Sequence, residues 1–497
     1  MQDFDVTNDF IDVKDGLKKR KNSFDDSDSN DKKSKIKRGL VVLAVAAVLA
    51  AAAVISFFVY AASFTKKQNI VALTESQKLE LNSILDEEYP EQRTRILKNL
   101  PYKISPNLDV WAESAILVDA SNGAVLFQKN SDEVIPPASL TKLFVMYIVF
   151  KDAAAGKVNL DDVVPLPEKS WAVNLPRDAS LMFLGQGQTV TLRELLKGLA
   201  VASGNDAAIA VANYISGSTD SFVERMNEEC ALLGLEKTHF VEPSGYDEHN
   251  VTTACELAAF CCEYIRKYPQ GIEEFHSAPS IKYPLGKNLP SWEKDKGDSL
   301  AIYQRNTNPL LGVLEGCDGI KTGFIYESGY NLALTAKRGG TRFISVTLRG
   351  RGVGSKQGNA GRIHDGEEMM EWAFSNFADF VPEEKLSEGF PDGFVVASIG
   401  AKNDSGKFVR LVPAWKNSVT VMKKSAETAK DEALGVKINI QTPKFIYGGT
   451  KAGDIYGQIQ YISENQVLET VPLVADRTQK KAGIFGRILG ALVSWKI

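Results

Sequence analysis

The sequence Pro136-Pro137-Ala138-Ser139-Leu140-Thr141-Lys142 decides the fold of the central part of this 497-residue chain. Its serine and lysine stand three positions apart, so a helix would place both side chains on one face. Proline is tolerated where the first helix amides have no partner, and we therefore expect a helix to begin near Ser139. Apolar residues surround the pair at Leu140, Leu143, Phe144, Met146 and Tyr147. The sequence thus predicts a buried lysine beside a serine hydroxyl.

The same Ser-x-x-Lys spacing also occurs at Ser29, Ser34, Ser63 and Ser291, so spacing alone does not single out Ser139. Two later motifs do. Ser203-Gly204-Asn205 follows an amphipathic stretch, and Lys321-Thr322-Gly323 is the only Lys-Thr-Gly in the chain. The three motifs, in this order, are typical of penicillin-reactive serine enzymes.

Each motif residue has a chemical reason to be there. A serine hydroxyl becomes a nucleophile when a base takes its proton, and a lysine serves as that base only when burial or nearby positive charge lowers its pKa. We expect Lys142 to be the base and Lys321 to supply the positive charge. The Ser203 hydroxyl would relay a proton, and the Asn205 amide would hold a substrate peptide bond.

The third motif is expected to form one wall of a binding cleft. The segment around Gly323 is strand-like, and a glycine lets a substrate backbone approach closely. An edge strand of this kind binds an extended peptide through main-chain hydrogen bonds. The backbone amides of Ser139 and Phe324 would then stabilise an oxyanion.

Composition excludes several other functions. A net charge of -4 provides no basic patch, so we expect no nucleic-acid partner. The five cysteines form neither a disulfide pattern nor a zinc motif, and the four histidines are scattered. We therefore predict no metal site and no cofactor.

The N-terminus reads as a membrane anchor. Residues 1–38 mix nine aspartates with ten basic residues, which predicts a disordered tail. Residues 39–65 are uncharged and long enough to cross a bilayer as a helix of about 1.5 Å rise per residue. Basic residues precede this segment, so the tail would lie in the cytoplasm and the rest of the chain outside. A cleaved signal peptide is the alternative, although its apolar core would be shorter.

The remaining chain divides into four parts. Residues 66–108 are expected to form a stalk with a short helix after Thr74, and residues 109–380 an α+β catalytic domain with helices between two sets of strands. Alternating short runs predict a small all-β domain over 381–478. Residues 479–497 form an apolar stripe opposite basic residues, which favours a membrane-associated amphipathic helix over one docked on its own domain.

From Ala112 to Arg477 the chain resembles the low-molecular-weight penicillin-binding proteins that act as serine-type D-alanyl-D-alanine carboxypeptidases. The resemblance rests on the three motifs and on the runs Ser180–Leu184, Glu242–Asp247 and Ser328–Leu332. It implies a penicillin-binding/β-lactamase-like transpeptidase fold, peptidoglycan stem peptides as substrates, β-lactams as covalent inhibitors through Ser139, and membrane lipid as a partner. It also implies that Arg362 and Thr322 bind the substrate carboxylate. The glycine-rich 350–361 segment, expected to be a loop, fits the family pattern poorly.

Three alternatives to a carboxypeptidase are considered from the residues. A class A β-lactamase would need a Glu-x-x-x-Asn loop between Ser203 and Lys321, and this spacing is absent. A DD-endopeptidase that cuts cross-links would use the same catalytic residues. A catalytically weak peptidoglycan-binding scaffold is disfavoured, because a scaffold has no reason to keep a complete set of catalytic motifs.

Overall fold

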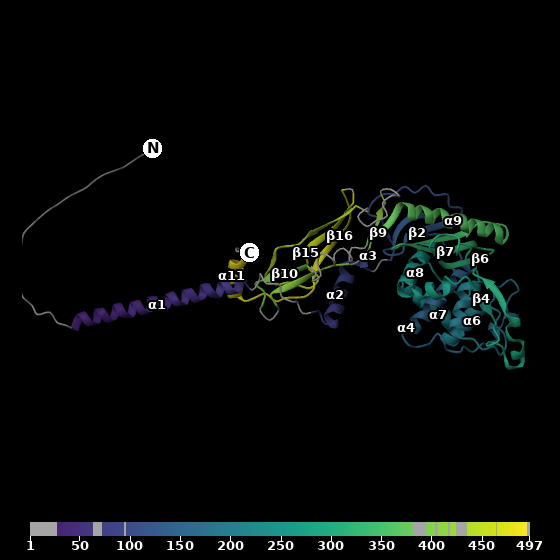
Figure 1. Ribbon diagram of the computed structural model, residues 1–497, viewed down its shortest axis with the longest axis horizontal. Coiled ribbons are helices and arrows are strands. Elements are labelled where there is room, and N and C mark those ends of the chain that lie inside the picture. The colour runs from purple at the N-terminus through teal and green to yellow at the C-terminus, as the bar shows by residue number, and fades with distance from the viewer. Residues whose placement is uncertain are drawn as a thin grey trace, which may run out of the picture.

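The computed structural model describes residues 27–62, 72–93, 96–380, 394–402, 406–415, 418–423, 435–463 and 465–494. An N-terminal helix, a small β domain and a larger domain follow one another along the long axis of the molecule (Figure 1). The larger domain combines helices with a mostly antiparallel sheet, and this confirms the predicted α+β fold class.

The larger domain is built on a six-stranded sheet with the order β1-β3-β2-β8-β7-β6. Neighbouring strands are antiparallel except for the β1–β3 pair. Its strands are β1 (Lys98–Asn99), β2 (Ser114–Asp119), β3 (Ala124–Lys129), β6 (Cys317–Ile325), β7 (Gly329–Arg338) and β8 (Thr341–Gly350). A tight turn at Ser121-Asn122-Gly123 joins β2 to β3 as a hairpin. Strand β6, which carries Lys-Thr-Gly, lies at the edge of the sheet, as expected.

Helices cover both faces of this sheet, which gives the domain three layers (Figure 1). Helix α9 (Gly354–Asn376) packs on β7 and β8 from one side, and α8 (Ala254–Lys267) packs on β2 and β8 from the other. Beyond α8 lies a helical part that holds most of the buried core. It comprises α4 (Lys142–Ala154), α5 (Leu192–Lys197), α6 (Asn205–Ser216) and α7 (Thr219–Leu232).

The expected loop over 350–361 is wrong from Gly354 onward, where α9 begins. The reason is packing. A Cβ at Gly358 would lie 2.2 Å from the Tyr330 ring, so glycine lets the helix approach β7 more closely than another residue could.

The small domain is a second six-stranded sheet, with the order β13-β15-β16-β11-β10-β14. Its strands are β10 (Phe394–Ile399), β11 (Phe408–Pro413), β13 (Val436–Gln441), β14 (Phe445–Tyr447), β15 (Ile455–Ser463) and β16 (Gln466–Ala475). The α2 helix (Glu75–Glu88) begins at Thr74 with a capping box, as the sequence indicates, but it packs on this domain. Leu81 and Leu85 are buried in the core of the β domain, and β1 joins the other sheet. In its described residues, 72–93 and 96–108, the segment predicted to be a stalk therefore packs on the two domains and is not separate from them.

The two domains are joined by paired strands. Strand β9 (Phe377–Phe380) pairs antiparallel with β12 (Val419–Met422), so the predicted boundary at 380 falls at the end of a paired strand. Thr420 donates its hydroxyl to Asp119 Oδ2 at 2.7 Å. Ser121 donates its backbone amide to Asp119 Oδ1 at 2.9 Å and its hydroxyl to Asp379 Oδ2 at 2.6 Å. The junction thus contains two carboxyl groups, those of Asp119 and Asp379, that both accept hydrogen bonds from Ser121.

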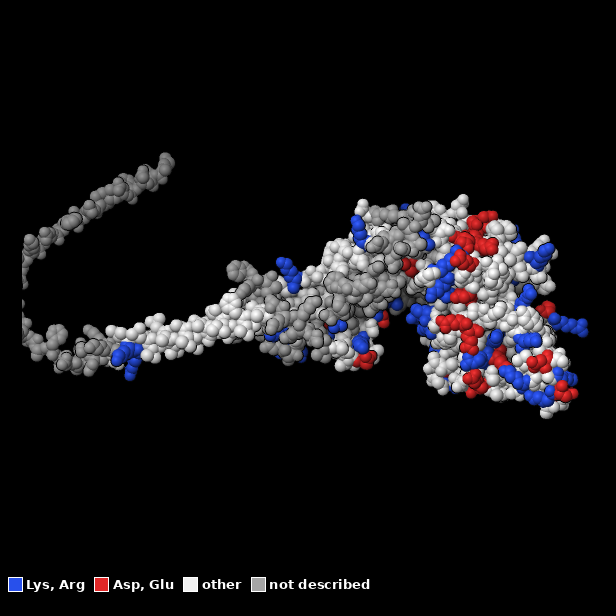
Figure 2. All heavy atoms as spheres, in the orientation of Figure 1, with Lys and Arg blue, Asp and Glu red and all other residues white. Residues whose placement is uncertain are grey.

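The N-terminal helix α1 (Ser27–Ala62) starts before the predicted tail ends, so residues 27–38 are helical and that part of the disorder prediction is wrong. Residues 1–26 lie outside the described part. Within α1, the stretch Ser34–Ala62 is long and apolar enough to cross a membrane. Figure 2 shows most of this helix as an uncharged rod with basic side chains at its start.

Both predicted membrane segments contact the end of the β domain that lies away from the larger domain. Ala61 of α1 is buried against a small cluster that includes Ile399 and Phe408. Helix α11 (Ile484–Ser494) lies beside β10, where Gly490 contacts Gly400. Three of its large apolar side chains are exposed, namely Ile484, Ile488 and Leu492. Of the predicted apolar stripe, the side chains of Phe485, Leu489 and Trp495 lie outside the described residues.

Candidate active site

The structure brings Ser139 and Lys142 together at the start of a buried helix. Residues Ala138–Thr141 form a 3₁₀ turn, η1, and Lys142 is the first residue of α4, so the expected single helix has two parts. In a 3₁₀ turn, residues three apart lie directly above one another. Lys142 Nζ accordingly lies 3.0 Å from Ser139 Oγ.

Lys142 has no contact with solvent. Its Nζ donates to Asn205 Oδ1 at 2.7 Å and to the Ser244 carbonyl at 2.5 Å. Burial lowers the pKa of Lys142 to about 7, against the opposing charges of Glu242 and Asp206. Near neutral pH a substantial fraction of this amine is therefore unprotonated and able to accept the Ser139 proton.

Lys321 is the second buried lysine, on β6, and its Nζ donates to the Thr322 carbonyl at 2.9 Å. Burial, followed by the positive charges of Lys142 and Arg362, holds the pKa of Lys321 well below its usual value. The sequence predicts that the positive charge of Lys321 lowers the pKa of Lys142. In the structure burial is the main cause of that shift.

Ser203 and Asn205 sit at a break between helices. Helix α5 continues as a π-helical turn, η4 (Gly198–Ala202), and Ser203 then adopts a left-handed backbone with φ 57°. That conformation is uncommon for a residue other than glycine and is typical of functional sites. Helix α6 starts at Asn205, which directs its side-chain oxygen at Lys142.

Asp206 fixes the segment that faces this break. Its carboxylate accepts hydrogen bonds from the backbone amides of Met182 at 2.8 Å, Phe183 at 2.8 Å and Leu184 at 3.0 Å. The Asp206 side chain is fully buried, and burial raises its pKa. The carboxylate therefore ties the Ser180–Leu184 run to the start of α6.

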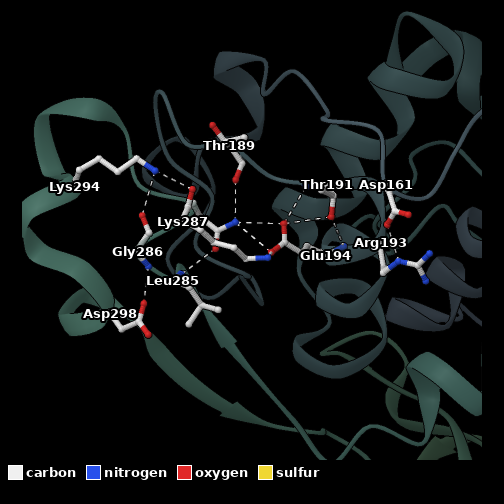
Figure 3. Close-up of polar contacts among 11 residues, drawn as sticks. Asp161, Thr189, Thr191, Arg193, Glu194, Leu285, Gly286, Lys287, Lys294 and Asp298 are labelled. Carbon is white, nitrogen blue, oxygen red and sulfur yellow. Dashed lines mark hydrogen bonds and ion pairs between the residues drawn. The ribbon is translucent and has the colours of Figure 1, made fainter.

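A polar cluster holds the other end of α5 (Figure 3). Glu194 accepts from the Thr191 amide at 3.0 Å, forms an ion pair with Lys287 at 2.7 Å and accepts from Asn288 Nδ2 at 3.2 Å. These contacts tie α5 to the segment that contains the two-stranded hairpin of β4 (Ser280–Tyr283) and β5 (Ile302–Arg305). This part of the chain thus supports the helix that leads to Ser203.

The segment after β5 then joins Ser203 to the edge strand. Thr307 donates its backbone amide to the Val201 carbonyl at 3.3 Å, and it accepts from Thr322 Oγ1 at 2.7 Å. One residue therefore links the η4 turn to the Lys-Thr-Gly strand.

Strand β6 lies directly against the serine turn. A Cβ at Gly323 would stand 2.6 Å from the Pro137 carbonyl oxygen and 3.2 Å from the Ser139 amide nitrogen. Glycine is therefore required for this approach. A cavity of about 1050 Å³ opens here, lined by Ser139, Ser203, Thr322, Gly323, Phe324 and Arg362, among others. A neighbouring cavity of about 520 Å³ is lined by Ser139, Asn205 and Phe324 and extends to Tyr246 and His249.

Arg362, predicted to bind a substrate carboxylate, reaches the larger cavity from α9. Its guanidinium already donates to the backbone carbonyls of Gly323 at 2.5 Å and Asn331 at 3.1 Å, and it lies over the Tyr330 ring. Burial lowers the pKa of Arg362 to about 10. The residue thus braces β6 as well as bordering the cavity.

Residues 242–246 form a part of the site that the sequence pattern does not predict. The Ser244 carbonyl is a ligand of Lys142, and Gly245 packs on the backbone beside Ser139. The run Glu242–Asp247 supports the family resemblance, but the sequence pattern assigns no role to any residue in it. A backbone carbonyl has no side-chain signature, so only the Glu-Pro-Ser-Gly run pointed to it.

Comparisons with known proteins agree with this geometry. The family described as D-alanyl-D-alanine carboxypeptidase matches residues 102–352. The D-alanyl-D-alanine carboxypeptidase DacA of Escherichia coli (strain K12) is 34% identical over 394 residues, which cover 77% of this chain and 87% of that protein. DacF of Bacillus subtilis (strain 168), described by the same activity, is 29% identical over 386 residues, covering 77% and 90%.

A solved structure resembles the chain over most of its length. Penicillin-binding protein 5 from Haemophilus influenzae superposes with a TM-score of 0.61 at 26% sequence identity, and the match covers 76% of this chain and all of that chain. The match is too long to be confined to the larger domain. Given the motif residues gathered at one cleft and these likenesses, the chain belongs to the D-alanyl-D-alanine carboxypeptidase family of low-molecular-weight penicillin-binding proteins.

Proposed function

We propose that Ser139 is the nucleophile of a serine D-alanyl-D-alanine carboxypeptidase, with Lys142 as its base. The observation that carries this proposal is the 3.0 Å separation of Ser139 Oγ and Lys142 Nζ, at a lysine whose pKa lies near 7. A general base works best when its pKa is close to the working pH. Ser139 borders a cleft whose wall is an open strand edge, and Lys142 lies buried behind it.

The reaction proceeds in two steps. Lys142 takes the Ser139 proton as Oγ attacks the carbonyl carbon of the penultimate D-alanine in a stem pentapeptide. The carbonyl oxygen becomes an oxyanion, held by the backbone amides of Ser139 and Phe324. The C–N bond then breaks, and Ser203 passes the proton from Lys142 to the nitrogen of the departing D-alanine. Water next hydrolyses the Ser139 ester and releases the shortened peptide.

The remaining site residues bind substrate. Asn205 holds a stem-peptide amide beside Lys142, and the Lys321, Thr322 and Gly323 segment pairs with the peptide backbone. The positive charges of Lys321 and Arg362 draw the terminal carboxylate towards Thr322. A β-lactam acylates Ser139 by the same attack, and the ester persists because the site lacks the glutamate and asparagine spacing of class A β-lactamases.

The membrane segments define where this reaction takes place. Helix α1 spans the bilayer with residues 1–38 on the cytoplasmic side, so the catalytic domain works on the outer side, where peptidoglycan lies. The exposed Ile484, Ile488 and Leu492 of α11 lie close to the end of α1 and insert into the lipid surface.

The test is direct. Purified protein incubated with a pentapeptide ending in D-Ala-D-Ala should release free D-alanine, and labelled penicillin should form a covalent adduct that maps to Ser139. The Ser139→Ala variant should fold normally and give neither signal. Folded wild-type protein that takes up no label and releases no D-alanine would refute the proposal.

A further inference from the structure

The Glu242 carboxylate gathers the loop that follows it. Oε2 accepts from the backbone amide of Ser244 at 2.7 Å and from its hydroxyl at 2.6 Å. Oε1 accepts from the amides of Gly245 at 2.5 Å and Tyr246 at 2.9 Å, and from Asn250 Nδ2 at 2.9 Å. A carboxylate with this many donors is held in one position and holds the loop in return.

This loop touches both reacting groups. The Ser244 carbonyl accepts a hydrogen bond from Lys142 Nζ. Gly245, with φ 78°, packs so closely on the turn before α4 that a Cβ would lie 1.9 Å from the Ala138 carbonyl oxygen and 2.8 Å from the Ser139 amide nitrogen. Displacing residues 244–245 would therefore shift the base and the nucleophile together.

We infer that Glu242 is a positioning residue for the Ser139–Lys142 pair and that its negative charge sets the pH at which Lys142 begins to act as a base. Glu242 reaches Lys142 through the Ser244 carbonyl and through its electric field, and it does not touch the reacting atoms. The inference rests on the proposed role of Lys142 as the base.

The charges that face Lys142 determine the sign of the effect. Glu242, from the loop, and Asp206, from α6, favour the protonated amine. Lys321, on β6, is a neighbouring positive charge whose own pKa is lowered by Lys142. Asp247, in the same loop, pairs with His249 at the surface. Removing the Glu242 charge leaves burial less opposed, so Lys142 would lose its proton at a lower pH.

The experiment compares Glu242→Gln with wild-type protein through the rate of acylation by labelled penicillin, measured from pH 5 to pH 9. The wild-type rate should rise with pH with a midpoint near 7, the pKa of Lys142. In Glu242→Gln we expect the midpoint to fall by about 0.5 to 1 pH unit. The plateau rate should also fall, by roughly tenfold, because an amide cannot accept all the hydrogen bonds that the carboxylate accepts.

Glu256→Gln is the matched control. Glu256 also ties down a loop, since it accepts from the Lys237 amide at 2.8 Å and the Thr238 hydroxyl at 2.6 Å, and it does not contact the cleft. Its substitution should leave the midpoint in place. The Ser244→Ala variant keeps the Glu242 charge and removes one bond to it, so it should also keep the wild-type midpoint.

The outcomes separate the two proposals. A uniform loss of rate in Glu242→Gln at an unchanged midpoint would mean that Glu242 has a structural role only, and it would overturn the inference. Wild-type protein that fails to acylate at any pH would instead refute the proposed function. If Glu242→Gln does not fold, Glu242→Asp withdraws the charge by one methylene, and a midpoint that stays at the wild-type value would then overturn the inference.

Discussion

Gly245 packs its Cα on the carbonyl of Ala138, although 107 positions separate the two residues in the chain, and a Cβ at Gly245 would stand 1.9 Å from that oxygen. A Cβ and an oxygen that are not bonded to each other do not approach so closely. The position of the backbone before Ser139 therefore depends on residue 245 having a hydrogen atom in place of a side chain.

Replacing Gly245 with alanine should damage both stability and catalysis. The positive φ alone costs roughly 1–2 kcal/mol, and the clash adds to this cost. We expect a lower melting temperature and acylation slowed at least about tenfold, because a displacement of about 1 Å at a reacting group costs that much or more.

The control for this variant is Gly217→Ala. Gly217 has a similar φ of 79°, with nothing within 4 Å of an added Cβ. It should show the stability cost of the backbone alone and a wild-type acylation rate. Equal acylation rates in the two variants would contradict a role for the Gly245 contact.

Removing the amine of Lys142 should stop acylation without unfolding the domain. The Lys142→Ala variant loses the base, so we expect penicillin acylation to fall by about 10²–10⁴-fold. Thermal unfolding checks the fold, and Lys151→Ala serves as the comparison, because Lys151 lies on the same helix and pairs with the buried Glu229. A near-normal acylation rate in Lys142→Ala would remove this residue as the base.

The carboxyl pair at the domain junction predicts a pH-dependent stability. Burial and the neighbouring Asp119 raise the pKa of Asp379 to about 9 from an ordinary value of 3.8. The folded protein therefore binds a proton that the unfolded chain releases above pH 4, and its stability falls as the pH rises from about 4 to 9. An asparagine at this position is neutral at every pH.

The Asp379→Asn variant should consequently gain melting temperature relative to wild type as the pH rises, with the largest gain near pH 9 and little gain near pH 4. Melting curves at four pH values between these limits would measure this. A difference between the two proteins that does not vary with pH would mean that Asp379 is not protonated in the fold.

Membrane attachment should need only one of the two apolar segments. We expect protein that lacks both 1–65 and 480–497 to remain in the soluble fraction and to react with penicillin. Deleting either segment alone should leave the protein in the membrane fraction. Tight membrane association after both deletions would refute the two-anchor proposal.

The site could be predicted from the sequence to the extent that its chemistry is local. The Ser139 and Lys142 spacing and the Lys-Thr-Gly motif are short-range patterns, and the structure has the helix start and the edge strand where the sequence predicts them. The hydrogen bond of Asn205 to Lys142 spans 63 positions, and the family resemblance, not the pattern, indicated that the two motifs meet.

Other features had no short-range signal. The capping box at Thr74 predicts a helix but does not say what its apolar face covers, and Leu81 and Leu85 turned out to pack on a sheet that begins about three hundred residues later. Strand β9 is four residues long, and its partner β12 lies beyond the predicted boundary. Partner choice at such distances depends on the whole core.

The paired strands β9 and β12, with the Thr420 bridge to Asp119, have a mechanical consequence. A single linker allows two domains to rotate relative to each other. A junction with paired strands and side-chain hydrogen bonds resists this rotation. The opening of the cleft should thus keep a constant orientation relative to the bilayer. The enzyme would then reach its next stem peptide by lateral diffusion of the anchored protein in the membrane, and not by rotation of the catalytic domain relative to the β domain.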